Sequence, residues 1–219
     1  MVKRGLTRDR LVAIAHRYVA DNGLEALTMR RLAIAAEVTP GALYKHVRDR
    51  RDLQRAMSDA IYATIDFSDL ELDRPTVAQV ITCCERMRAA MLGFRDGGRI
   101  VAGSYSPFAA TLKLSATLMR LVQGVALPEF EPGDLVAVLR SHTIGFVIDE
   151  QAYLELERSG EWESLLESLD DHGTRINAAG DIRSTVTGDR DRRFTAGLRA
   201  ILAGTVRADV ESMTGPPTT

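Results

Sequence analysis

The sequence has few cysteines and few aromatic residues, and this scarcity excludes several classes of protein. Only 2 of its 219 residues are cysteine, and aromatic residues make up 5%. A disulfide-bonded framework is therefore excluded, and the core has to be built from aliphatic side chains. No apolar run approaches the roughly 20 residues that a helix needs to cross a bilayer, and residues 1–10 lack the apolar segment of a secretory signal. We therefore expect a cytoplasmic protein with no membrane partner.

The sequence also lacks the short motifs of common enzymes. It contains no glycine-rich phosphate loop, no nucleophile elbow and no set of histidines and cysteines at metal-ligand spacing. An enzyme would have to rely on His142 with Asp149 and Ser104, or on the adjacent thiols Cys83 and Cys84. Neighbouring cysteines rarely bridge to each other, so this pair is either two small residues packed on a helix or a vicinal-thiol sensor. We expect no catalytic residue, no metal and no cofactor.

Charge is distributed unevenly along the chain. The overall net charge is −2, but residues 1–60 hold 12 basic and 7 acidic side chains, and the remainder balances to −7. A basic end followed by an acidic body is typical of a DNA-reading head on a domain that avoids DNA. A random scatter of solvated charges is the alternative.

Residues 27–53 predict three helices in close succession. Thr28 is placed to cap the first and Asp49 to cap the third, because short polar side chains accept the free backbone N–H groups of a first helical turn. A tight turn near Glu37 separates the first helix from the second. Two short helices joined in this way form a helix-turn-helix, a unit that DNA-binding proteins present to DNA.

The second of these helices is predicted over residues 40–47. Thr39 and Pro40 mark its start, because a threonine hydroxyl can accept a backbone N–H and the fixed φ of proline suits the first helical position. Leu43 and Val47, four residues apart, give the helix one apolar stripe. A helix of about two turns is not stable alone in water, so its neighbours must hold it. Such a helix suits entry into the major groove of DNA.

Helical spacing of apolar residues continues to the end of the chain, and no alternation typical of strands stands out. We therefore predict an all-α protein with a three-helix helix-turn-helix domain over residues 1–67 and a larger helical domain over residues 68–219. The helices expected in the larger domain span 76–94, 108–123, 134–158 and 189–213, with a short helix at 162–169 inside a polar loop of residues 160–188.

Three runs of the N-terminal region, 24–33, 38–47 and 49–53, form a long ordered match to one family. They resemble the DNA-binding domain of the TetR family of bacterial repressors. The turn of this family usually carries a glycine, and Glu37 occupies that place here. A residue other than glycine costs roughly 1 kcal/mol there if φ is positive, unless the turn has a different shape.

The resemblance implies a transcriptional regulator whose second short helix enters the major groove of a double-stranded DNA operator. Arg30 is the residue best suited to read a base, because arginine can bind guanine O6 and N7 through two hydrogen bonds. A solvated arginine is the alternative, and Tyr44 either contacts DNA or packs against protein. The DNA-binding residues that the resemblance implies are Thr28, Arg30, Thr39, Pro40, Gly41, Ala42, Tyr44, Lys45, His46, Arg48 and Arg50.

Residues 95–104 and 142–151 resemble segments of the tetracycline-responsive members of the family, which hold the drug and its metal. Val101 stands here at the metal-binding histidine, and Ile65 stands at an upstream histidine. Neither side chain can ligate magnesium, so we predict no magnesium-dependent tetracycline binding. The remaining pocket is expected to take a largely hydrophobic small molecule. Its residues, each of which can instead be a packing residue, are Ile65, Cys83, Met87, Val101, Ser104, Tyr105, His142, Phe146 and Asp149.

The helices expected over 134–158 and 189–213 carry wide apolar stripes with small residues. These stripes either form internal core or face a second subunit, and the resemblance implies a four-helix interface of a homodimer. A two-fold dimer suits a palindromic operator with half-sites about one turn apart. We therefore interpret the chain as a repressor that a small-molecule effector releases from DNA. An architectural DNA-binding protein without an effector is the main alternative, and a helical enzyme is a less favoured one.

Overall fold

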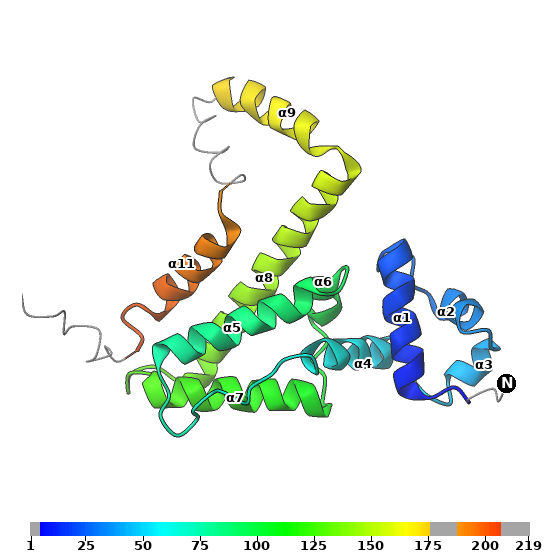
Figure 1. Ribbon diagram of the computed structural model, residues 1–219, viewed down its shortest axis with the longest axis horizontal. Coiled ribbons are helices and arrows are strands. Elements are labelled where there is room, and N and C mark those ends of the chain that lie inside the picture. The colour runs from blue at the N-terminus through cyan, green and yellow to red at the C-terminus, as the bar shows by residue number, and fades with distance from the viewer. Residues whose placement is uncertain (1–4, 176–187, 207–219) are drawn as a thin grey trace, which may run out of the picture.

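The computed structural model describes residues 5–175 and 188–206, and every regular element within them is a helix (Figure 1). The predicted all-α class is therefore confirmed. No helix in those ranges is both long and apolar enough to cross a membrane. The helices are α1 (Arg8–Asn22), α2 (Met29–Ala35), α3 (Pro40–Leu43), α4 (Arg50–Tyr62), α5 (Val77–Leu92), α6 (Gly97–Val101), α7 (Ala109–Val125), α8 (Pro132–Ser159), α9 (Trp162–Arg175) and α11 (Arg190–Leu202).

The head of the molecule consists of α1, α2 and α3, with the first turns of α4 completing its core (Figure 1). The side chains of Thr28 and Asp49 cap α2 and α4 as predicted, each by accepting the backbone N–H three residues later. Aliphatic side chains from all four helices are buried together, which holds the short α3 in place. The main ones are Leu11, Ala15, Leu32, Leu43, Val47 and Leu53.

The helix α3 differs from its prediction in length and in its cap. Its α-helical turn covers Pro40–Leu43 and not the two turns expected. The chain then tightens, because the backbone N–H groups of His46 and Val47 both donate to the carbonyl of Leu43, at 2.9 and 3.1 Å. Thr39 makes no side-chain cap hydrogen bond, so the expected cap is wrong. The predicted apolar stripe is present, since Leu43 and Val47 are both buried.

The body is a bundle of α5, α6, α7 and α8, with α11 lying along α8 and α5 (Figure 1). The helix α4 leaves the head and packs against α5, α6 and α7, so it belongs to both parts. The core of the body is largely aliphatic, as the low aromatic content predicted. Its buried side chains include Val80, Met87, Ile100, Leu114, Leu118, Leu121, Leu139 and Val147.

Two helices of the body end at other places than predicted. The helix α9 continues to Arg175, beyond the short helix expected at 162–169. The helix α11 ends at Leu202, because Ala203 is extended and Gly204 has φ 79°. The chain there turns back toward the end of α7, where the N–H of Leu127 donates to the carbonyl of Thr205 at 3.0 Å. The rest of the expected helix, and part of the polar loop, lies outside the described residues.

Glu37 has φ 55° in the turn between α2 and α3, so the turn has the positive φ of its glycine-bearing counterparts. Replacing Glu37 by glycine is expected to raise the free energy of unfolding by about 0.5–1 kcal/mol. The left-handed conformation costs a residue with a Cβ roughly 1–2 kcal/mol, and the entropy that glycine loses on folding offsets part of the gain. Urea unfolding followed by circular dichroism measures the change. Glu37→Ala is the control, and equal stability of the two variants would contradict strain at this turn.

Candidate DNA interface and effector site

The tip of the head presents α3 and the residues after it to solvent (Figure 1). Tyr44 is 54% exposed, which is high for an aromatic side chain, and Lys45 is exposed beside it. A Cβ added at Gly41 would meet no atom within 4 Å. The backbone of this turn is therefore open to close approach by another molecule. Polar side chains beside an open backbone suit contact with phosphates and base edges.

The other residues predicted to bind DNA lie at the start of α2, around α3 and around the start of α4. Thr28 and Arg30 are exposed at the first turn of α2, which packs against α3. Arg48 and Arg50 are exposed around the start of α4. His46 is half-buried and Ala42 is partly covered, so these two present less surface than their neighbours. The structure thus gathers the predicted set on one end of the head, and their contact with DNA stays a prediction.

A buried carboxylate ties the start of α1 to the segment that follows α3. The side chain of Asp52 is 4% exposed, and it accepts hydrogen bonds from the guanidinium of Arg8 at 3.0 Å and the backbone N–H of Arg48 at 2.9 Å. Burial alone would raise the pKa of Asp52, but these hydrogen bonds and the two positive charges outweigh it and hold the pKa below its ordinary value. The guanidinium of Arg8 also lies over the ring of Phe108, 4.4 Å from its centre, at the start of α7. The head is therefore tied to the body at this point.

A second set of contacts ties the opposite end of α1 to the turn between α5 and α6. The carboxylate of Asp96 accepts the backbone N–H of Leu24 at 2.8 Å, and Arg95 donates to the carbonyl of Ala20 at 3.1 Å. Arg99 forms an ion pair with Glu25. The head is thus held against the body at both ends of α1, by the contact of Arg8 with Phe108 at its start and by hydrogen bonds at its end.

The helix α4 is hydrogen-bonded to α6, to α7 and to the segment between them. Gln54 donates to the carbonyl of Ile100 at 3.0 Å, and Arg55 donates to the carbonyl of Ser104 at 3.2 Å. One carboxylate oxygen of Asp59 accepts both the N–H and the hydroxyl of Thr111, at 2.7 and 2.9 Å. Sequence reasoning missed these residues, because polar side chains on an amphipathic helix look the same whether they face water or a neighbouring backbone.

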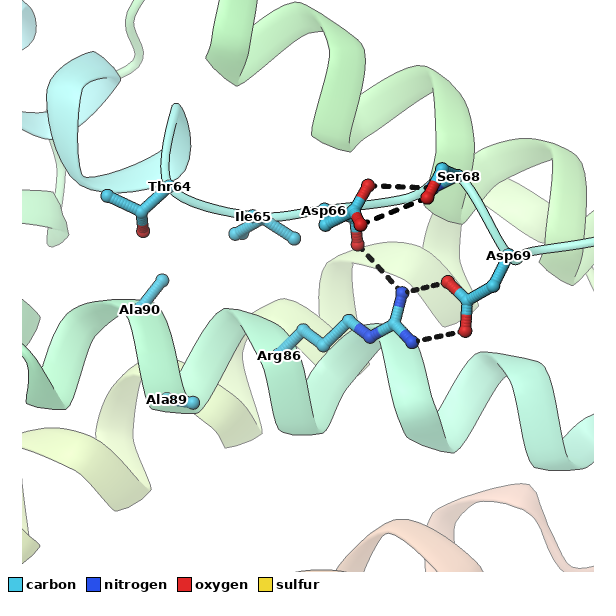
Figure 2. Close-up of a pocket in the computed structure, with 8 residues that line it drawn as sticks. All are labelled: Thr64, Ile65, Asp66, Ser68, Asp69, Arg86, Ala89 and Ala90. Atoms are coloured by element: carbon cyan, nitrogen blue, oxygen red, sulfur yellow. Dashed lines mark hydrogen bonds and ion pairs between the residues drawn. The ribbon is translucent and has the colours of Figure 1, made fainter.

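Four of the residues predicted to bind an effector, Ile65, Cys83, Met87 and Val101, are buried side chains of the core. Ile65 also borders a cavity of about 540 Å³ between the end of α4 and α5 (Figure 2). Figure 2 shows Arg86 at one side of this cavity, where it donates to both carboxylate oxygens of Asp69. Because that arginine is already paired, the cavity offers no unpaired cation to a ligand.

Burial determines the protonation state of the two cysteine thiols. It raises the pKa of the Cys83 thiol to about 12, against a smaller opposing effect of Arg86, and it raises the pKa of Cys84 further. Both thiols are free and buried, and both are protonated at neutral pH. Since the thiolate is the reactive species, the structure favours packing residues over a redox sensor.

The remaining predicted effector residues do not gather in one place. His142 and Phe146 face α11, where the ring of His142 stacks on Phe194 with centroids 5.5 Å apart. Asp149 is exposed, and Tyr105 is 81% exposed. The described residues include no cluster of histidine, cysteine, aspartate or glutamate able to hold a metal ion. The structure therefore divides the predicted set between core, surface and the α8–α11 contact, and its role in binding stays a prediction.

These features define a class of protein, a helix-turn-helix head joined to a larger helical body by a shared helix. Comparison with protein families supports the same class. The model described as "Bacterial regulatory proteins, tetR family" matches residues 11–57, and the model described as "Tetracyclin repressor-like, C-terminal domain" matches residues 75–208. The chain belongs to the TetR family of transcriptional regulators, and it is not an enzyme.

Individual relatives extend along most of the chain. The Tetracycline repressor protein class C of Escherichia coli is 29% identical over 205 residues, which cover 91% of this chain and 90% of that protein. The structure of BioQ with its double-stranded DNA operator is 29% identical, covers 72% of this chain and 95% of its own, and has a TM-score of 0.59. ActR of Streptomyces coelicolor in complex with (S)-DNPA is 26% identical, covers 91% and 97%, and has a TM-score of 0.71.

Replacing Asp52 by asparagine is expected to lower the free energy of unfolding at neutral pH by roughly 1–3 kcal/mol, because Arg8 loses its charged partner. The pKa of Asp52 is lowered in the folded state, so its contribution is present above the unfolded pKa and is lost as the pH falls through the folded pKa. The difference between wild type and variant should therefore shrink below about pH 4. Urea unfolding from pH 7 to pH 3 measures it. Asp149→Asn, at an exposed site, is the control, and a difference independent of pH would count against this role of the carboxylate.

Proposed function

We propose that the chain is a homodimeric repressor that binds a palindromic DNA operator and that a small-molecule effector releases it. The observation that carries the proposal is the exposed α3 on a head that is tied to the body at both ends of α1, by the contact of Arg8 with Phe108 and by the hydrogen bond of Leu24 with Asp96. The related BioQ has been solved with its DNA operator, and the related ActR has been solved with (S)-DNPA. These neighbours support a DNA partner and an effector for this chain.

The proposed DNA-reading part comprises residues 1–67, and the proposed effector-binding and dimerisation part comprises residues 68–219. In this arrangement α3 enters the major groove and Tyr44 and Lys45 contact phosphates or base edges. Arg30 reads guanine from the first turn of α2. The protein acts on DNA in the cytoplasm.

The proposed dimer interface is formed by α8 and α11. Exposed small or apolar residues follow one another at helical spacing along α8, which suits a facing helix. They are Val138, Ser141, Gly145 and Ala152. A Cβ added at Gly145 would meet no atom of its own chain within 4 Å, so the surface there is open to a second subunit.

The proposed release of DNA is a linkage between two conformations. An effector can loosen the operator only by binding one conformation more tightly than the other. The contacts of Gln54 with α6, of Arg55 with the segment after α6 and of Asp59 with α7 give a physical route, because a shift of α6 or α7 must move α4 or break those hydrogen bonds. The proposed effector is not a tetracycline–magnesium complex, since Val101 and Ile65 offer no ligand atom.

Replacing Arg30 by alanine is expected to weaken operator binding by ~1–3 kcal/mol and to relax preference at one base pair. Fluorescence anisotropy with the operator from the promoter of the neighbouring genes, at fixed salt, measures the affinity. Arg120→Ala removes the same charge from an exposed site on α7 and should leave affinity unchanged. Equal losses in both variants would mean that Arg30 acts only through the net charge.

The chain is expected to form a dimer of about twice 24.0 kDa in light scattering. Gly145→Glu should convert it to a monomer, because a charge is then buried in an apolar interface. Gly133→Glu is the matched control, since a Cβ there also meets nothing within 4 Å but lies in the first turn of α8. A dimer that survives Gly145→Glu would exclude this face as the interface.

A further inference from the structure

A cleft of about 650 Å³ lies between the head and the second half of α8. The turn after α1 lines it on the head side, and the end of α5, the start of α6 and α8 line it on the body side. Figure 1 shows the end of α1 close to α6, where the N–H of Leu24 donates to Asp96. The volume is within the range of roughly 300–1,000 Å³ found for small-molecule sites. A molecule in this cleft would contact the head and the body together.

Aliphatic side chains from three elements meet in the cleft. Leu24 after α1, Leu92 at the end of α5 and Ile148 on α8 line it and are each half-buried. Leu154, one and a half turns further along α8, also lines it and is 37% exposed. An apolar molecule seated here would remove the remaining surface of these side chains from water, which is favourable.

The charges around the cleft are already paired. Among the described residues, six charged side chains line the cleft, and they form two groups joined by ion pairs. The groups are Glu25–Arg99–Asp96 and Arg95–Glu155–Arg158. A charge on a ligand would have to break one of these pairs or leave water without a partner, and both are costly. The cleft therefore favours an uncharged molecule.

The core positions predicted to bind an effector are packed, in contrast to this cleft. Cys83, Met87 and Val101 are 1%, 0% and 2% exposed. A ligand placed among them would have to displace close-packed side chains. The cleft is open to a ligand without such a rearrangement.

We propose that the effector binds in this cleft and that it is an uncharged, largely apolar molecule. Arg95 already joins the two sides, because it donates to the carbonyl of Ala20 on α1 at 3.1 Å and to Glu155 on α8 at 3.0 Å. A molecule held against Leu24 and Ile148 adds contacts between the same parts, so it favours the placement of the head in this structure. This inference rests on the proposed release of DNA by an effector, and it makes this placement the one released from DNA.

The first test compares two fluorescent probes with one skeleton, N-phenyl-1-naphthylamine and 8-anilinonaphthalene-1-sulfonate. Only the second carries a charge. The fluorescence of both rises in apolar surroundings, so titration of the full chain gives their dissociation constants. The wild type should bind the uncharged probe at least tenfold more tightly. Equal affinities, or no saturable binding of the uncharged probe, would overturn the inference.

Two variants with matched controls place the probe. Leu154→Gln should weaken binding of the uncharged probe about fivefold, because apolar contact is lost. Leu165→Gln on α9, at 38% exposure, is its control and should leave binding unchanged. Glu155→Gln removes the carboxylate shared by Arg95 and Arg158, so the sulfonate probe should bind about fivefold more tightly. The uncharged probe should keep its affinity in that variant.

Glu129→Gln, which removes the same charge from an exposed site before α8, is the control for Glu155→Gln and should change neither affinity. A loss in Leu154→Gln no larger than in Leu165→Gln would overturn the cleft as the site. So would a sulfonate affinity that responds equally to Glu155→Gln and Glu129→Gln, because a probe bound elsewhere does not sense this particular carboxylate.

The third test links the cleft to DNA. A saturating amount of the uncharged probe should release the wild type from its operator, and Leu154→Gln should raise the probe concentration needed by the same factor as its dissociation constant. Binding in the cleft without release would overturn its assignment as the effector site. Gly145→Glu should still bind the probe, and loss of binding there would overturn the inference by making the cleft part of the subunit interface.

Failure of the wild type to bind operator DNA without any probe would overturn the proposed function itself. The probe titrations need no DNA, so they decide the existence of the cleft site separately.

Discussion

The head and the body share one helix, α4, and the placement of the DNA surface depends on how that helix is held at each end. At its start, Asp49 caps it, and Asp52 ties it to Arg8 of α1 and to Arg48 after α3. Further along, Gln54 and Asp59 bond to α6 and α7. Any change in the packing of the body therefore reaches the head through a rigid element whose two ends are fixed by hydrogen bonds.

The contacts that surround the ends of α1 are not all equally strong. The Arg99–Glu25 pair is exposed and contributes little, because solvent screens it. The hydrogen bond from Leu24 to Asp96 and the buried carboxylate of Asp52 matter more, since each satisfies a backbone or charged group that is shielded from water. The head is thus attached to the body at a few firm contacts. When the body residues at these contacts shift, the head moves with them as one unit.

Much of the fold was predictable from the sequence, because apolar spacing and capping residues such as Thr28 and Asp49 are local signals. The short α3 was not, because the tight bonds to the carbonyl of Leu43 are a tertiary outcome that periodicity does not encode. The residues predicted to bind DNA came from motif and charge, and the structure gathers them on one end of the head. The effector residues were harder to place, because periodicity does not tell which flank of α8 meets α11 and which meets α6.

The burial of both native thiols has a practical consequence for solution work. Cys83 and Cys84 are shielded inside the body at 1% exposure each, so a maleimide dye reaches them only when the packing around α5 opens. A single cysteine introduced on the exposed surface beside Tyr44 can therefore carry a fluorophore without removal of the natural pair. The rate at which that pair is labelled would then measure, in the same sample, how fast the body opens.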